Sequence, residues 1–494
     1  MRINTQRAGN LRNHAKHSSS NILLWILTGL ALVSALAGVC LLSLSFDHGP
    51  RNIEKPILPL VLVMAFAGAI YLLALRKTNL LRNRWLLIWI FGIGLVARLL
   101  MFFTTPILED DHYRYLWDGG VVASGFNPYK YAPKEFLTPS ETIIPSELKI
   151  LAKEAGTILQ HVNHPELRTI YPPLAQGTFA LAHWISPWSL SAWRVVLLVT
   201  DVATLILLSY VLFIFGFPMK GLVVYWWNPL LIKEIYNSGH MDVLLFPFLL
   251  ATFFFTSRQH YLLGSGVLGI ASGIKIWPVL LLPIVLRPLW CQPRRMLLGL
   301  FVFIFTSGIV LFPILYTGLG ELSGLSAYAS YWQMNDALYM AFFWGINKVA
   351  TMSNDPIFTH LLARSVVVCI LVILTFLIIR KDHFNNKELA GRFLLLTAML
   401  FFLSPTQFPW YFLWLLPFLA LRISFSLLLL SALLPIYYMR FYFEARQNTD
   451  IFDHWVVWLE YAPVWFLLIS KAMKSSFLQD SKRIQVSEIT HISQ

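Results

Sequence analysis

The chain has 494 residues, of which 57% are hydrophobic and only 13% are charged. Soluble domains carry about 25% charged residues. The sequence also contains several uncharged runs of roughly 20 residues, the length that crosses a bilayer as a helix. These values exclude a soluble enzyme, a nucleic-acid-binding module and a disordered protein. They predict an all-α polytopic membrane protein, because the apolar runs are too long and uniform for the alternating strands of a membrane barrel.

The net charge of +13 is concentrated in five short stretches that hold 19 of the 38 basic residues and four acids. The rest of the chain is therefore slightly acidic. Short cytoplasmic loops of membrane proteins collect Lys and Arg, so we interpret these stretches as cytoplasmic and expect no nucleic-acid partner. They are residues 2–16, 76–84, 287–295, 380–392 and 471–488.

The apolar runs can be threaded from a cytoplasmic N-terminus. Residues 22–46 lead outward, 57–75 return, and 85–103 lead outward again. The polar stretch 105–170 follows, with nine acids against six basic residues, and we expect it outside the cytoplasm. Further spans are expected at 296–316, 361–379, 393–403, 410–421, 424–442 and 455–470. The sequence thus predicts a bundle of roughly 11–13 transmembrane helices with a large extracytoplasmic first loop.

Residues 171–286 contain too few basic residues for the charge rule to decide their threading. In one threading, 172–185 crosses the bilayer and 237–242 lies on the cytoplasmic side. In the other, 172–185 is a partial helix, 237–242 faces outward, and 261–286 breaks into two half-helices at 273–278. We favour the second threading, because broken helices with polar turns are tolerated where they line a protein cavity.

Three consecutive carboxylates, Glu109, Asp110 and Asp111, directly follow the third apolar run. They repel one another unless hydrogen bonds, a cation or Arg114 compensates. Such crowding can raise a carboxyl pKa and produce a general base, or it can gather a divalent cation such as Mg or Mn. The alternative is that Asp110 or Asp111 only caps a surface helix. Capping explains one acid but not three.

If Asp111 opens a short helix, Arg114, Tyr115 and Asp118 follow it three, four and seven residues later. Residues with this spacing lie along one helix face. That face would present a guanidinium, a phenol and carboxylates together at the bilayer surface.

Two further motifs come next in the chain, Gly125-Phe126-Asn127-Pro128-Tyr129 and Tyr171-Pro172-Pro173-Leu174. With the acidic pair and the aromatic helix, they resemble the polyprenyl-phosphate-sugar-dependent glycosyltransferases of the GT-C fold. The resemblance is closest to bacterial polyprenyl-phosphate-mannose-dependent mannosyltransferases and more distant to GPI-anchor mannosyltransferase I. Weaker matches lie at residues 237–242, 266–278 and 407–417.

The matching motifs span residues 85–421, which we interpret as a GT-C-like catalytic membrane module that includes the loop 105–170. Residues 1–84 would then be a cytoplasmic N-terminus with two leading transmembrane helices, outside the resemblance. Residues 422–494 would be C-terminal transmembrane helices and a cytoplasmic tail.

The resemblance implies a donor in which one phosphate joins the sugar, expected to be mannose, to a polyprenol in the membrane. It implies a lipid-linked or cell-envelope glycan as acceptor, membrane lipids as surroundings, and an active site that faces outward from a bacterial inner membrane. Asp110 or Asp111 would deprotonate the acceptor hydroxyl as that oxygen attacks the anomeric carbon, with inversion. Lys275 or Arg114 would stabilise the departing phosphate.

Several side chains are candidates for holding donor or acceptor, each with a structural alternative. Lys275 and the pair His240 and Asp242 could instead form buried ion pairs or caps. Aromatic residues such as Trp332 and Trp410 could stack on sugars or anchor the protein at the interface. The candidate substrate-binding residues are Arg114, Tyr115, Asp118, Asn127, Tyr129, Tyr171, His240, Asp242, Lys275, Trp332, Gln407 and Trp410.

A multi-helix transporter of a polar or lipid-linked solute is the main alternative function. It would use Lys275 and His240 as intramembrane binding residues. It explains the helices but not the acidic aromatic loop, and the sequence shows no internal repeat of the kind found in many transporters.

Overall fold

The computed structural model describes residues 2–47, 54–76, 84–138, 143–318, 320, 323–349, 356–380 and 385–492. These residues form helices joined by turns, with no β-strand among them. The all-α architecture predicted from the sequence is therefore confirmed. Short 3-10 and π-helical segments, labelled η, interrupt several helices.

The chain begins with α1 (Arg2–Asp47), α2 (Ile57–Arg76) and α3 (Arg84–Phe102). The large loop folds into α4 (Asp111–Ala123), α5 (Lys134–Leu137), α6 (Ser146–Ala155) and α7 (Thr157–Gln160). It is followed by α8 (Pro173–Ile185) and α9 (Leu190–Ile214). Two interrupted helical segments come next, of which the first is a bent helix pair. The first consists of α10 (Gly221–Trp226), α11 (Pro229–Ile232), η2 (Lys233–Asn237), η3 (Met241–Leu245) and α12 (Phe246–Ser257). The second consists of α13 (Tyr261–Ala271), η4 (Trp277–Leu281), α14 (Leu282–Leu286) and η5 (Arg287–Leu289).

The second half starts with α15 (Pro293–Thr317), α16 (Gly324–Tyr331), α17 (Ala337–Val349) and α18 (Pro356–Ile379). The segments α19 (Asn386–Leu403), α20 (Pro409–Phe412), η6 (Leu413–Leu415) and α21 (Leu416–Leu421) follow. The chain ends with α22 (Phe425–Leu433), η7 (Leu434–Tyr438), α23 (Met439–Glu444), α24 (Thr449–Ile451), η8 (Phe452–Val456) and α25 (Val457–Ile492).

Eight helices within the described ranges are long and apolar enough to cross a membrane, or up to nine if the bent pair at residues 221–257 is one span. Three shorter apolar helices lie at Tyr261–Ala271, Trp277–Leu289 and Pro409–Leu421. The chain is a multi-pass membrane protein. The predicted number of roughly 11–13 spans is reached only if shorter helices also cross, so that number stays a prediction.

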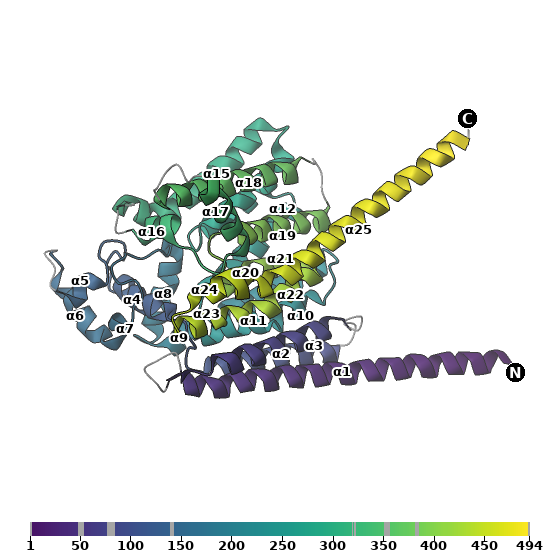
Figure 1. Cartoon of the computed structure of the whole chain (residues 1–494), viewed down its shortest axis with the longest axis horizontal. Helices are drawn as coiled ribbons and strands as arrows, with labels where there is room; N and C mark the ends of the chain where they lie inside the picture. The colour runs from purple at the N-terminus through teal and green to yellow at the C-terminus, as the bar shows by residue number, and fades with distance from the viewer. Residues whose placement is uncertain are drawn as a thin grey trace.

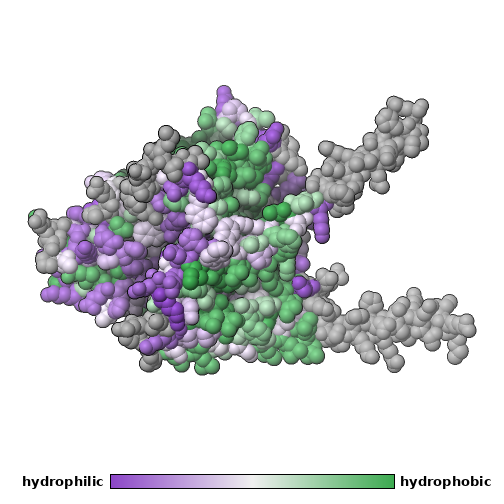
Figure 2. All heavy atoms as spheres, viewed as in Figure 1, coloured by the Kyte–Doolittle hydropathy of each residue, from purple (hydrophilic) through white to green (hydrophobic). Residues whose placement is uncertain are grey.

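Polar and apolar surfaces separate along the bundle. Figure 1 shows α4 to α7 at one end, whereas α1 begins and α25 ends at the opposite end. Figure 2 shows hydrophobic residues over the helices and hydrophilic residues gathered at the end that carries α4 to α7. The large loop therefore projects beyond the apolar part of the molecule, as the threading requires.

Helix α8 is a partial helix, because its 13 residues are too few to cross a bilayer. It packs closely on α4, where a Cβ atom on Gly119 would lie 2.5 Å from the carbonyl oxygen of Phe179. The break that the favoured threading predicts at 273–278 is also observed, since α13 ends at Ala271 and η4 begins at Trp277. The backbone N–H of Leu174 donates to the carbonyl of Gly273 over 2.8 Å, which joins this break to the start of α8.

A fully buried ion pair between α3 and α9 also contacts the bent helix pair at residues 221–257. The Nε atom of Arg98 lies 2.7 Å from an oxygen of Asp201, and neither side chain is exposed. The hydroxyl groups of Tyr225 and Tyr236 also donate to Asp201, over 2.6 and 2.7 Å. Arg98 in turn donates to the carbonyl of Trp226. This cluster fixes the helices that lead into the break at 237–241.

We predict that Asp201→Ala lowers the stability of the purified protein by about 3–5 kcal/mol, because it leaves Arg98 buried without an anion. Thermal melting in detergent measures the effect. The matched control is Thr200→Ala, since the Thr200 hydroxyl bonds only to the Val196 carbonyl of its own helix. Equal melting temperatures for both variants would contradict a stabilising role of the Arg98–Asp201 ion pair.

Candidate active site

A cavity of about 190 Å³ lies at the end of the bundle that carries α4. Its floor contains Glu109, Asp110 and Asp111, which lie between the end of α3 and the first turn of α4. Lys275 reaches it from the break between α13 and η4. The aromatic part of its wall is formed by Tyr328, Trp332, Phe408, Trp410 and Tyr411.

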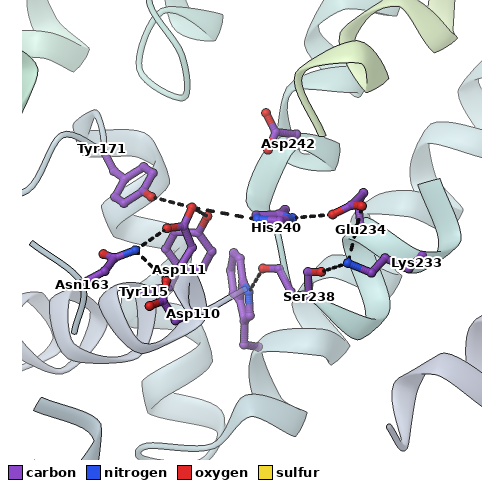
Figure 3. A network of polar contacts seen from close by, with 12 residues as sticks. Asp110, Asp111, Tyr115, Asn163, Tyr171, Lys233, Glu234, Ser238, His240 and Asp242 are labelled. Carbon is purple, nitrogen blue, oxygen red and sulfur yellow. Dashed lines mark hydrogen bonds and ion pairs between the residues drawn. The ribbon is translucent and has the colours of Figure 1, made fainter. Parts of the chain in front are cut away.

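Asp111 is the carboxylate on which most polar groups converge (Figure 3). One of its oxygens accepts a hydrogen bond from the Asn163 amide over 2.8 Å. The other accepts from the hydroxyls of Tyr115 and Tyr171, each over 3.3 Å. These three hydrogen bonds hold the Asp111 carboxylate in a defined orientation at the cavity.

Asp110 occupies the N-cap position of α4, but its side chain makes no capping hydrogen bond. It instead accepts from the same Asn163 amide, over 2.8 Å. Part of Asp110 faces solvent. Withdrawal of its carboxylate from bulk water and the negative charge of Asp111 nevertheless raise the pKa of Asp110. Burial likewise raises the pKa of Glu109 well above its ordinary value.

A row of buried polar side chains runs inward from Asp111 (Figure 3). The Nε2 atom of His240 lies 4.0 Å from an oxygen of Asp111 and has no hydrogen-bond partner among the described residues. Its Nδ1 atom lies 3.1 Å from an oxygen of Glu234. Glu234 also accepts from the hydroxyl of Tyr438 over 2.6 Å, and its other neighbour is the ammonium of Lys233 at 3.6 Å.

The position of His240 is fixed by the bend that follows η2. The two helices of the bent pair meet at 109°, and Gly239 between them adopts a φ of +79°, which glycine tolerates because it has no Cβ. The imidazole stacks on Trp410 with 3.8 Å between ring centroids. Residues 237–242 therefore lie beside Asp111, as the favoured threading predicts.

Lys275 lies against a carboxylate and two aromatic faces. Its ammonium is 3.5 Å from an oxygen of Asp242 and 4.8 Å from the ring centroid of Tyr411. The same Asp242 oxygen accepts from the indole of Trp414 over 2.6 Å, while the second oxygen is buried without a partner in the described part of the chain. Because Lys275 is 15% exposed and lines the cavity, its charge can reach a bound anion.

Arg114 lines the cavity but uses its guanidinium to hold the loop. It donates to the carbonyls of Asn163, His164 and Leu167 over 2.8, 2.9 and 3.1 Å. These bonds place the Asn163 amide against both aspartates. Arg114 therefore helps to set the shape of the site.

Seven of the twelve predicted substrate-binding residues do not line the cavity. Three of them, Tyr115, His240 and Asp242, contact residues that do. The other four hold neighbouring elements. Asp118 accepts from Gln176 over 3.0 Å at the contact between α4 and α8. Asn127 accepts from the Tyr129 backbone N–H in a turn, and the Tyr129 hydroxyl donates to the carbonyl of Tyr171. The Gln407 amide donates to the carbonyls of Phe402 and Ser404, which satisfies the end of α19. These contacts hold the elements around the site together.

The structure adds residues that the sequence analysis did not select. Asn163 carried no signal, because it is one polar residue in a long polar loop. Lys233 and Glu234 did carry a sequence signal, since adjacent charges in an apolar segment are costly and are usually paired or functional. Tyr438 lies far along the chain and reaches Glu234 only through folding.

The two aspartates do not by themselves fit a resident divalent cation. Such ions take six or more oxygen ligands, and the described residues contain no group of three or more His, Cys, Asp or Glu side chains placed to hold a metal. The Asn163 amide nitrogen lies against an oxygen of each aspartate. The expectation of Mg or Mn at Asp110 and Asp111 stays a prediction.

The fold and the site define a multi-pass membrane protein with a carboxylate-lined cavity at one end of its helices. A sequence model of the family described as "Alpha-(1->6)-mannopyranosyltransferase, N-terminal domain" matches residues 8–291, more than half of the chain. The chain belongs to this family and is a glycosyltransferase. The matched residues include α1 and α2, which the motif resemblance did not cover. Searches of curated proteins and of solved structures gave no match.

Proposed function

We propose that this protein transfers mannose from a polyprenyl-phosphate-mannose donor to a lipid-linked or cell-envelope glycan, with inversion of the anomeric carbon. The observation that carries the proposal is the cavity that presents Asp111 and the ammonium of Lys275 to the same space. Transfer from a lipid phosphate needs a base for the acceptor and a cation for the leaving group. The family membership supports mannose as the sugar.

Asp111 acts as the general base in this mechanism. Its oxygens are oriented by Asn163, Tyr115 and Tyr171, so the carboxylate is positioned before substrate binds. It takes the proton of the acceptor hydroxyl as that oxygen forms a bond to the anomeric carbon. The carbon–oxygen bond to the lipid phosphate breaks on the opposite face, which gives inversion.

Lys275 stabilises the departing lipid phosphate. A preorganised cation lowers the free energy of a transition state in which negative charge develops on the leaving group. Asp242 and the faces of Tyr411 and Trp414 hold the ammonium in place, at 3.5 Å from the carboxylate. The aromatic wall offers Trp332 and Trp410 as surfaces on which sugar rings can stack.

The family description supports an alpha-(1→6) linkage in the product. An inverting enzyme that forms an alpha linkage requires a donor with the beta configuration at its anomeric carbon. We therefore propose a beta-linked polyprenyl phosphate mannose as donor. A transporter, the alternative from the sequence, receives no support from the family match.

The charge distribution supports an active site outside the cytoplasm of a bacterial inner membrane. The basic stretches 287–295 and 380–392 fall between apolar helices in the sequence, and short cytoplasmic loops collect basic residues. A long lipid donor then enters from the membrane and a glycan acceptor from the periplasmic side.

We predict that Asp111→Asn lowers the rate of mannose transfer by about 10²–10⁴-fold, the usual contribution of a general base. Asp110→Asn should have a smaller effect, because Asp110 shares only the Asn163 contact. The assay uses purified protein in lipid vesicles, labelled polyprenyl-phosphate-mannose and a panel of mannosyl acceptors.

The matched control for this assay is Glu147→Gln, an acid on the exposed face of α6 in the same loop. It should transfer mannose at the wild-type rate. Full activity of Asp111→Asn would overturn the assignment of the base. No transfer by the wild-type protein with any donor, together with saturable solute uptake, would favour a transporter.

Topology can be measured separately by cysteine labelling of intact cells with a membrane-impermeant maleimide. Ile143 is 92% exposed and lies in the large loop, so Ile143→Cys should react from outside. The exposed native Cys291, in a basic stretch, should react only after lysis. Cys40 and Cys369 are replaced by Ser for this test. The reverse pattern would contradict the proposed orientation.

A further inference from the structure

A second, larger cavity lies among the helices away from the active site. It has a volume of about 980 Å³ and is bordered by α17, α18, α19, α22, α25 and the turn between α21 and α22. Most of its lining is apolar, including Leu395, Ala398, Phe402, Leu427 and Trp465. Leu395 is 43% exposed and Ile469 is 59% exposed, so the cavity opens laterally between α19 and α25 as a groove.

The polar residues of the groove gather at one end. Arg392, Arg422 and Lys471 line it there, and Glu388 is the opposing acid. Arg422 and Lys471 are exposed, and Arg422 donates one hydrogen bond to the Lys387 carbonyl over 3.2 Å. The net charge at this end is positive. It is the end at which α25 leaves the bundle, opposite the loop that contains the active site (Figure 1).

The dimensions suit a hydrocarbon chain. The lining residues on α19 extend from Glu388 to Phe402, which at 1.5 Å per residue is about 20 Å of helix. One leaflet of the ~30 Å hydrocarbon layer is shorter than that. An amphiphile with its head at the basic end can therefore place an acyl chain along the whole groove. A basic pocket between transmembrane helices is a feature that attracts anionic lipid head groups.

We propose that this groove binds an anionic glycerophospholipid from the leaflet opposite the active site. Its phosphate lies near Arg422 and Lys471, and an acyl chain runs toward Phe402 and Trp465. The position excludes the sugar donor in its reacting pose, because the donor phosphate must lie near Lys275 at the other end. The proposal does not depend on the sugar or on the acceptor.

At the end of the groove away from the basic residues, lining side chains contact residues that hold the aromatic wall of the active-site cavity in place. Phe402 and Trp465 both pack on the ring of Tyr461, with centroids 6.3 and 6.0 Å apart. The Tyr461 hydroxyl donates to the carbonyl of Asn335, and the Asn335 amide donates to Glu460 and to the Gln407 carbonyl. A lipid chain in the groove therefore supports the segments that carry Trp332 and Trp410.

The test measures lipid retention by the full-length protein. Purified protein is incubated with vesicles that contain phosphatidylglycerol and phosphatidylcholine with the same acyl chains, extracted again, and analysed for bound lipid. The wild-type protein should retain phosphatidylglycerol in preference. The Arg422→Gln and Lys471→Gln changes should each reduce that retention about fivefold, and leave phosphatidylcholine unaffected.

The matched control is Arg294→Gln with Lys474→Gln, two exposed basic residues in basic stretches that do not line the groove. This variant should retain as much phosphatidylglycerol as the wild type, and all variants are compared for helicity. Equal retention of both lipids by the wild type would overturn the proposal. So would an equal loss in the control variant, or displacement of phosphatidylglycerol by polyprenyl phosphate or by glycerol phosphate, which has no tail.

Discussion

The site depends on one constraint, namely that backbone groups freed where helices break inside an apolar bundle must find hydrogen-bond partners. At the first break, the Asn237 amide donates to Thr104 and to the Thr105 carbonyl and accepts from the Ile107 backbone. At the second, the Gly273 carbonyl accepts from two residues of α8. The first break is thereby tied to the residues that precede the aspartates, and the second break to the start of α8, which follows the large loop.

The connection between α19 and α20 follows the same rule with a different partner. The Gln407 backbone N–H donates to the carbonyl of Met334, and the Met334 N–H donates to that of Pro405. This short exchange brings the aromatic residues of two distant segments to one wall of the cavity. The broken helices are therefore required for the active site, because they bring His240, Lys275 and Trp410 together from separate parts of the sequence.

The buried polar row from Asp111 to Lys233 has a cost in stability. Four ionisable or imidazole groups lie in a region that would be more stable if it were apolar. Their arrangement orients groups at the cavity, where His240 places a nitrogen that has no partner among the described residues 4.0 Å from Asp111. Stability of the surrounding helices comes instead from closely packed apolar side chains and from the Arg98–Asp201 pair.

The sequence was sufficient to predict the helical membrane fold, the acidic loop and the broken helix at Lys275, because these follow from local hydropathy and from crowded charges. It was not sufficient for Asn163, Glu234 or Tyr438, whose roles arise only from contacts between distant segments. It suggested Arg114 and Lys275 as phosphate ligands, and both line the cavity, where the Arg114 guanidinium also donates to three loop carbonyls. Local patterns identify which residues are unusual, and only the fold shows which of them meet.

The central claim is inverting transfer from a lipid phosphate donor. The most direct measurement offers the purified protein beta- and alpha-linked polyprenyl-phosphate-mannose in separate reactions and determines the anomeric configuration of the product by NMR. The account predicts that only the beta-linked donor is used and that the new linkage is alpha. A product that keeps the configuration of its donor would contradict it.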